Sequence, residues 1–149
     1  MHVSLAALED IPELCELLAT LFSQETEFSP DPIRQAKGLK AILADPSVGL
    51  ILVLKDDGQI IGMVILLFTI STFLGSRVAL LEDMIIHPAH REKGAGTLLL
   101  QTAIQTASER GCRRITLLTD GSNAQAKVFY RKRGFVESSM TPYRLICPD

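Results

Sequence analysis

The sequence predicts a mixed α/β domain in which helices pack against a central sheet. In several segments, apolar side chains recur at the spacing of an amphipathic helix. Between these segments lie short apolar runs that are rich in β-branched residues and bounded by Gly, Pro or Asp, a pattern typical of strands. A chain of 149 residues fits one domain. We therefore expect a single domain over residues 1–149, with the element order β-α-α-β-β-β-α-β-α-β-β.

The first third of the chain predicts one strand and two helices. Residues 2–5 form a short strand, and Asp10 caps a helix that carries Pro12 in its first turn. A polar loop that contains two prolines follows. A second helix is expected over 32–44, and Asp45-Pro46 ends it because the residue before a proline disfavours helical backbone angles.

Three strands follow. The runs 48–54 and 60–68 flank Asp56-Asp57-Gly58, which is a hairpin signal. Gly62 inside the second run marks either a bulge or a close packing contact. After a turn, the apolar run 77–86 fits a strand that is buried on both faces.

The last third alternates helices and strands. An amphipathic helix over 97–110 is closed by Gly111, and a buried strand follows at 115–119. Ser122 or Asn123 caps a further helix, which ends at Gly134. Two short closing strands are expected at 135–137 and 143–146.

The most informative segment is Arg91-Glu92-Lys93-Gly94-Ala95-Gly96, between an apolar strand and a helix. Such a turn exposes backbone N–H groups at the positive end of the helix, which suits a phosphate. Arg91 and Lys93 can add charge-assisted hydrogen bonds. Leu99 stands where a dinucleotide-binding fingerprint needs a third glycine, and the Gly-Lys-Ser/Thr triplet of a P-loop is missing from the sequence. The segment therefore predicts a different phosphorylated cofactor.

The string from Leu81 to Pro88, followed by 91–96, resembles the acetyl-CoA signature of the GNAT family of N-acetyltransferases. Residues 123–135 resemble that family's second motif, Asn-x-x-Ala-x-x-Phe-Tyr-x-x-x-Gly-Phe. The resemblance covers residues 80 to 137 and implies the GNAT fold, acetyl-CoA as cosubstrate and no metal. The cofactor-binding residues that it implies are Met84, Ile85, Ile86, Arg91, Glu92, Lys93, Gly94, Ala95, Gly96, Thr97, Asn123, Phe129 and Tyr130.

In this family the loop wraps the CoA pyrophosphate, and the backbone of 84–86 pairs with the pantetheine arm like an extra strand. The N–H group of Ile86 is expected to polarise the thioester carbonyl. Three positions depart from the common pattern. His90 replaces an aromatic residue, Glu92 a glycine and Ala95 an Ile or Val. Glu92 adds a negative charge near phosphates, which weakens binding.

Two residues are implied as catalytic, Glu82 and Tyr130. Glu82 is an acid in an apolar strand, where burial would raise its pKa. The Leu-Glu-Asp string resembles the polyamine acetyltransferase branch, in which this glutamate takes the amine proton directly or through water. An ion pair at the edge of the core is the alternative. Asp83 is expected on the opposite strand face, as a contact for a cationic acceptor or as a structural hydrogen-bond acceptor.

Tyr130 is the expected acid, because the resemblance implies that its hydroxyl faces the CoA sulfur. An ordinary pKa of ~10 keeps it protonated. A core tyrosine is the alternative. Asn123 either reaches the pantetheine arm or serves only as a helix cap.

The acceptor pocket of the family usually involves the first two helices. Phe28 lies there among Glu25, Glu27 and Asp31, which would suit a cationic amine. A solvated loop explains the same residues and is the simpler interpretation.

The net charge, the length of the apolar runs and the cysteine content limit the kinds of partner and location that the sequence allows. A net charge of −2 argues against nucleic acid, and no apolar run is long enough to predict a membrane span. Three widely spaced cysteines and no signal-peptide pattern favour the cytoplasm. A homodimer is left open.

We expect direct acetyl transfer from acetyl-CoA to a primary amine of a small molecule. The alternatives are a protein N-terminal or lysine acetyltransferase, a catalytically idle domain that binds CoA, and a binder of another phosphorylated ligand.

Overall fold

The computed structural model describes residues 1–25 and 27–149. They form two compact units, Met1–Leu118 and Thr119–Asp149. The helices and strands of the first unit are β1 (His2–Leu5), η1 (Leu8–Asp10), α1 (Ile11–Ser23), α2 (Pro32–Ala44), β2 (Gly49–Asp56), β3 (Gln59–Ser71), β4 (Ser76–Ile86), η2 (Pro88–His90), α3 (Ala95–Glu109) and β5 (Ile115–Leu117). The second unit contains α4 (Ala124–Arg131). The expectation of one domain stays a prediction.

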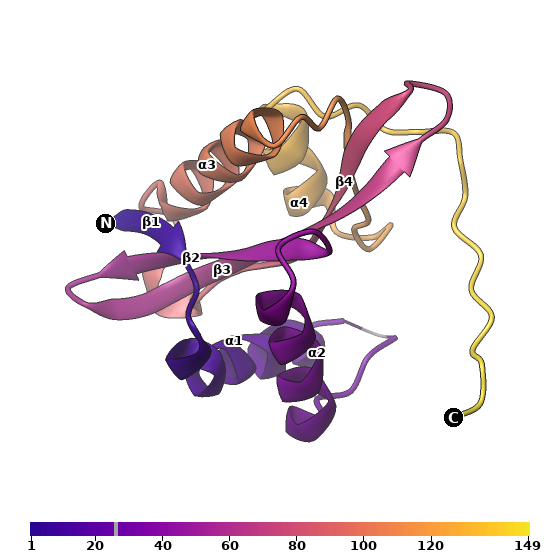
Figure 1. Ribbon diagram of the computed structural model, residues 1–149. Helices are drawn as coiled ribbons and strands as arrows, with labels where there is room; N and C mark the ends of the chain where they lie inside the picture. The colour runs from indigo at the N-terminus through magenta and orange to yellow at the C-terminus, as the bar shows by residue number, and fades with distance from the viewer. Residues whose placement is uncertain (26) are drawn as a thin grey trace. The chain divides into compact units, whose positions relative to one another are not determined.

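The first unit is a mixed sheet covered by helices on both faces. Its five strands lie in the order β1-β2-β3-β4-β5. Neighbours from β1 to β4 are antiparallel, whereas β5 is parallel to β4. Helices α1 and α2 cover one face and α3 covers the other (Figure 1). This arrangement confirms the α/β class and the predicted element order as far as α4.

Alternation along the strands divides the core into two layers. On the face of α1 and α2, buried side chains from the helices meet alternate residues of β2, β3 and β4, among them Val53, Met63 and Ile65. The intervening residues of β2 point to the face of α3, which buries Leu99 and Leu100 completely. The central strands are therefore buried on both faces, as expected for the apolar runs.

The two N-terminal helices begin at the predicted positions, by different means. Helix α2 has Pro32 in its first turn, and the Asp31 side chain accepts a hydrogen bond from the Arg34 N–H at 3.2 Å. Asp10 precedes α1, but its Oδ2 accepts from the Ala7 N–H at 2.8 Å instead of capping the helix. The prediction that the Asp10 side chain caps α1 is therefore wrong, because its carboxylate is hydrogen-bonded to the N–H group of Ala7, the residue directly before η1.

Between β2 and β3, the predicted hairpin is confirmed. Asp57 and Gly58 both have positive φ, 47° and 78°, as the favoured two-residue turn requires. Gly62 combines both of its expected roles. The register shifts beside it between Leu54 and Lys55, and a Cβ at Gly62 would lie 2.6 Å from Ile86 Cδ1 and 3.0 Å from the Ile85 carbonyl oxygen.

We expect Gly62→Ala to destabilise the protein by about 1–2 kcal/mol, because the added methyl group presses on the β4 backbone. Urea unfolding monitored by circular dichroism measures the change. The control is Gly38→Ala on α2, where a Cβ meets nothing within 4 Å. That variant is expected to be stabilised by up to ~1 kcal/mol. Equal effects of the two substitutions would contradict the close approach at Gly62.

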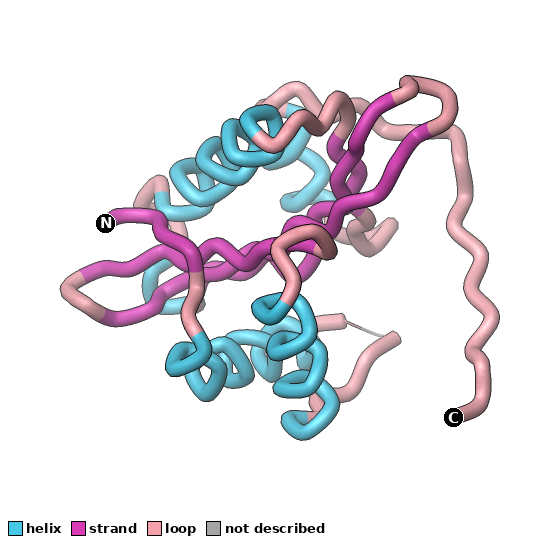
Figure 2. Tube along the Cα trace, in the orientation of Figure 1, coloured by secondary structure: helices cyan, strands magenta, loops and turns pink. Residues whose placement is uncertain are grey.

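The second unit consists of one helix and a long segment without helix or strand (Figure 2). Residues 135–137 and 143–146 form no strand, so the prediction of two closing strands is wrong. A strand is stable only where the backbone N–H and C=O groups of a neighbouring strand pair with its own. Here the side chains that suggested strands are exposed instead, including Val136 at 89% and Tyr143 at 96%.

Candidate active site

Strands β4 and β5 separate at the point where the candidate residues of β4 begin. Their pairing ends at Leu81 and Leu117, while β4 continues along β3 as far as Ile86. The His87 N–H donates to the Ile61 carbonyl at 2.7 Å, so by alternation the backbone of Ile86 faces away from β3. The side of β4 that faces away from β3 thus has no strand partner beyond Leu81 among the described residues.

A bulge lies at the start of this unpaired stretch. Ile65 pairs with Glu82 and Met63 with Ile85, so Asp83 and Met84 together stand opposite Val64. Asp83 has φ of 50°, a left-handed conformation that Asp tolerates better than most residues. Simple alternation between Glu82 and Asp83 is therefore interrupted at these two carboxylates.

The burial of the two acids differs from the expectation. Glu82 is exposed, whereas Asp83 is half-buried. Burial, followed by the charges of Glu82 and Glu25, raises the pKa of Asp83 to about 6. The expectation that Glu82 is the buried acid is wrong, because the bulge brings the next residue inward. The catalytic role of Glu82 stays a prediction.

The turn before α3 fits the phosphate-binding expectation. Gly94 stands at the N-cap with φ of 78°, and no side chain caps the helix. The first turn therefore begins with the N–H groups of Ala95 and Gly96, and the Leu98 N–H is already within the helix, donating to the Gly94 carbonyl at 3.0 Å. Arg91, Glu92 and Lys93 are exposed in front of this turn. The residues present fit a pyrophosphate.

Arg91 also holds the turn to the end of β4. Its Nε donates to the Ile86 carbonyl oxygen at 3.1 Å. The Ile86 carbonyl is thus occupied, and the terminal guanidinium nitrogens remain to meet an anion. The sequence analysis predicted only that Arg91 binds a phosphate. Nothing in the sequence pattern predicts its hydrogen bond to the backbone of Ile86.

Glu92 adopts φ of 65°, a left-handed conformation that favours glycine. We expect Glu92→Gly to bind CoA about threefold to fivefold more tightly, because a nearby negative charge costs ~1 kcal/mol in water. Isothermal titration calorimetry with CoA measures the change. Glu92→Gln is the matched control, since it removes the charge and keeps a residue with a Cβ. Unchanged or weaker affinity in both variants would place Glu92 away from the phosphates.

The remaining candidates lie together in the second unit. Asn123 is the N-cap of α4, and its Oδ1 accepts from the Ala126 N–H at 3.0 Å. The ring of Tyr130 lies 5.2 Å from that of Phe129 and 5.7 Å from that of Phe135. Burial raises the pKa of Tyr130 to about 12, so its hydroxyl stays protonated at neutral pH. The cap role of Asn123 is established, while its cofactor role and those of Phe129 and Tyr130 stay predictions.

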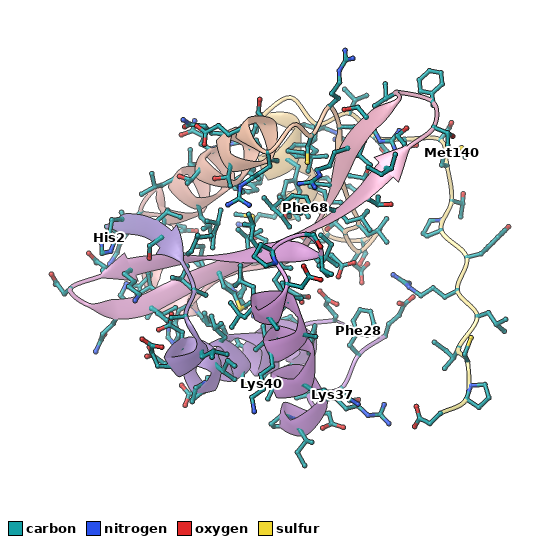
Figure 3. All side chains as sticks on the ribbon, viewed as in Figure 1. His2, Phe28, Lys37, Lys40, Phe68 and Met140 are labelled. Carbon is teal, nitrogen blue, oxygen red and sulfur yellow. The ribbon has the colours of Figure 1, made fainter. Side chains whose placement is uncertain are left out.

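A pocket of about 540 Å³ lies between the end of α1 and the start of α2. Its lining includes Phe22 and Phe28, whose ring centroids are 5.7 Å apart, together with Asp31 and Gln35. Figure 3 shows Phe28 on the loop beside α2. The Gln35 Oε1 is buried without a hydrogen-bond partner in the described part of the chain. Gln35 was missed by the sequence reasoning, because a lone Gln in an amphipathic helix carries no signal.

Among residues 1–25 and 27–149, no group of three or more His, Cys, Asp or Glu side chains is placed to hold a metal ion. No helix in the same residues is both long and apolar enough to cross a bilayer. The cytoplasmic location stays a prediction.

Comparison with known proteins identifies the class. Residues 11–135 match the model of the acetyltransferase (GNAT) family. The chain belongs to this family, and its class of enzyme is N-acetyltransferase. Members of the family normally use acetyl-CoA.

Individual relatives agree with this class. The chain is similar to the uncharacterized N-acetyltransferase YhfO of Bacillus subtilis strain 168, with 32% identity over 128 residues, 82% of this chain and 83% of that protein. It is 40% identical over 55 residues to the streptothricin acetyltransferase of Streptomyces lavendulae, a match that spans 37% of this chain and 29% of that enzyme. The solved structure of a putative acetyltransferase from Agrobacterium tumefaciens str. C58 matches with a TM-score of 0.82 and 26% identity, over 99% of this chain and 100% of that chain.

Proposed function

We propose that this enzyme transfers the acetyl group of acetyl-CoA directly to a primary amine of a small cationic molecule. The observation that carries the proposal is the set of carboxylates at the β4 bulge. Burial raises the pKa of Asp83, and the nearby charges of Glu82 and Glu25 raise it further, to about 6. Such a set is best relieved by a bound cation, because an ammonium group offsets the repulsion among carboxylates. A protonated amine is the cation that this class of reaction uses.

The unpaired backbone of β4 and the first turn of α3 supply the cofactor side of the proposed site. We expect the backbone of Met84 and Ile86 to pair with the pantetheine amides, as a peptide adds to a sheet edge. The pyrophosphate would bind at 91–97. The Ile86 N–H would then polarise the thioester carbonyl, while Arg91 occupies the carbonyl of the same residue.

The proposed reaction conserves protons and charge. The amine binds as its ammonium form and gives a proton to Glu82, directly or through water. Its lone pair attacks the thioester carbon, and the C–S bond breaks as the amide bond forms. The hydroxyl of Tyr130 donates a proton to the departing thiolate, which is a role that a pKa of about 12 permits. The attacking nitrogen loses its second proton, which restores the tyrosine through solvent, and Glu82 releases the first proton to solvent.

A small acceptor is favoured over a protein by the pocket beside Phe28. Its volume of about 540 Å³ suits a small molecule, and its lining combines two aromatic rings with Asp31 and Gln35. The Leu-Glu-Asp string at 81–83 resembles the polyamine branch and supports the same class. The similarity to streptothricin acetyltransferase spans only 55 residues and gives no acceptor.

Release of free CoA thiol, measured across a panel of acceptors, tests the function. The panel contains di- and polyamines, a neutral-tailed monoamine, and peptides with a free N-terminus or a lysine. We expect turnover with the polycationic amines and little with the others. Turnover of peptides alone would favour a protein acetyltransferase. CoA binding without turnover of any acceptor would favour the catalytically idle domain.

The cofactor site has a test that is independent of the acceptor. Gly96→Val is expected to weaken CoA binding at least tenfold, because a β-branched side chain in the first turn of α3 blocks close approach of the phosphates. Calorimetric titration with CoA measures the affinity. The control is Ser108→Val, which adds the same side chain at an exposed position in the last turn of α3. Unchanged affinity in Gly96→Val would remove the basis for this site.

A further inference from the structure

The peptide group between Ile86 and His87, at the end of β4, is held on both sides. Its N–H group, which belongs to His87, donates to the Ile61 carbonyl oxygen of β3 at 2.7 Å. Its carbonyl oxygen, which belongs to Ile86, accepts a hydrogen bond from the Nε of Arg91 at 3.1 Å. The N–H and C=O groups of a trans peptide point in opposite directions, so these two bonds together fix the orientation of the peptide plane. The Arg91 side chain is therefore part of the structure of the strand end.

The segment that joins this peptide to the phosphate-binding turn is short and internally bonded. Helix η2 lies within it, and the His90 N–H donates to the His87 carbonyl oxygen at 2.8 Å. The Ala89 N–H donates to the Nδ1 of the His87 side chain at 3.2 Å. Arg91 directly follows η2, and its Nε returns to the peptide at the start of the segment. Bonds within the chain itself therefore tie the end of β4 to the first residue of the turn.

Arg91 has two chemical properties that act in different ways. Its positive charge is spread over the guanidinium group, and Lys93 supplies a second positive charge in the same turn, while Glu92 between them supplies a negative one. The attraction of such a charge for a phosphate depends only weakly on its exact place and is screened by salt. The Nε–H, in contrast, is a single donor that is directed at a backbone oxygen. The Nε–H is therefore the property that Lys93 cannot replace.

We propose that Arg91 is a positioning residue, and that its Nε–H sets the placement of the Ile86 N–H relative to the phosphate-binding turn. In the proposed function, on which this inference rests, these two groups hold the thioester carbonyl and the pyrophosphate of the same acetyl-CoA molecule. A cofactor that is bound at both places is sensitive to their separation, because the reacting carbonyl must lie close to its donor. Loss of the Nε–H therefore lowers kcat, whereas loss of the charge weakens cofactor binding.

Two substitutions of Arg91 separate the donor from the charge. In Arg91→Gln, the amide nitrogen is bonded to Cδ, as Nε is in arginine, so the donor remains and the charge is removed. In Arg91→Lys, the charge remains and a methylene group stands in the place of Nε. We expect Arg91→Lys to lower kcat about tenfold, with a KM for acetyl-CoA within about twofold of the wild-type value. We expect Arg91→Gln to raise that KM about threefold to fivefold and to keep roughly half or more of the wild-type kcat.

Lys93→Gln is the matched control for the charge. It removes one positive charge from the same turn without touching the bond to Ile86, so it is expected to raise the KM for acetyl-CoA as Arg91→Gln does. A kcat in Arg91→Lys that is not lower than the kcat in Arg91→Gln would overturn the proposal, because the charge would then account for the whole contribution of Arg91.

Amide hydrogen exchange, measured by NMR on the protein without cofactor, tests the same bond in the absence of turnover. Arg91→Lys is expected to speed the exchange of the His87 N–H about fivefold, because the peptide plane is then held on one side only. Arg91→Gln is expected to keep the wild-type exchange rate. Equal rates in the wild type and both variants would contradict the positioning role even in an enzyme that acetylates amines. A wild-type protein that turns over no acceptor, with faster exchange in Arg91→Lys alone, would refute the proposed function and support the positioning role.

Discussion

Tyr130→Phe is expected to lower kcat by about 100-fold or more with the fold intact, since the phenyl ring keeps the contacts with Phe129 and Phe135. Only the hydroxyl is lost, and with it the proposed proton donor to the CoA thiolate. Steady-state turnover of any accepted amine, with thermal unfolding as a check on folding, measures the effect.

The sequence has two tyrosines, which provides a matched control for this test. Tyr143→Phe removes the hydroxyl from a side chain that is 96% exposed, and its kcat should be close to the wild-type value. Because burial raises the pKa of Tyr130 to about 12, its ionisation produces no loss of activity below pH 10. A wild-type kcat in Tyr130→Phe would assign this residue to packing alone.

The second large effect is expected in the pH dependence of kcat/KM, which separates the two carboxylates of β4. A pKa of about 6 means that Asp83 becomes neutral as the pH falls through 6. The proposed site then loses a negative charge that would attract an ammonium substrate. We therefore expect kcat/KM of the wild-type enzyme to fall as the pH drops through 6 and to level off near the value of Asp83→Asn, which lacks this limb.

Glu82→Gln is expected to behave differently. Its acid limb moves below pH 6, because the charge of Glu82 no longer raises the pKa of Asp83. The variant lowers kcat/KM at neutral pH by about 10²-fold or more and recovers in part at high pH, where more of the amine is already neutral. CoA affinity serves as the control for both variants and should not change. A Glu82→Gln enzyme with the parental profile would show that the proton leaves by another route, and loss of CoA binding would make Glu82 structural.

Stability gives an independent check on Asp83. Its pKa is raised from the ordinary value of 3.8 to about 6, so the folded state binds more protons than the unfolded state between these two pH values. Stability is therefore present below pH ~4 and is lost as the pH rises through 6. Asp83→Asn should gain roughly 1–3 kcal/mol relative to the wild type at pH 8 and nothing at pH 4.

Local periodicity and turn chemistry were enough to predict most of the fold. Helix α2 was bounded by Pro32 and by Asp45-Pro46, and the hairpin by Asp57-Gly58. These signals act within a few residues, so the sequence displays them directly. The closing strands failed for the opposite reason, because Tyr143 and Ile146 have strand preference, but strand formation depends on pairing with a segment distant in the sequence, which no local signal displays.

The candidate site was predicted unevenly for the same physical reason. The motif pointed to the turn at 91–96 and to the carboxylates of β4 as candidates, since both are contiguous in sequence. It missed the exchange of burial between Glu82 and Asp83, because a bulge results from the pairing of two strands. The bond from Arg91 to Ile86 and the unpaired Gln35 likewise depend on tertiary contacts that no spacing rule displays.

The bulge also bears on how this enzyme can diverge. The flanking pairs, Ile65 with Glu82 and Met63 with Ile85, would both persist in a chain that lacked Asp83, since Met84 could then pair with Val64. The sheet therefore does not require Asp83 to maintain its register. Loss or gain of one codon at this position alters the charge at the proposed acceptor site while the cross-strand pairs stay in place. If Asp83 contacts the acceptor, acceptor preference can thus change through chain length alone, without any substitution in the core.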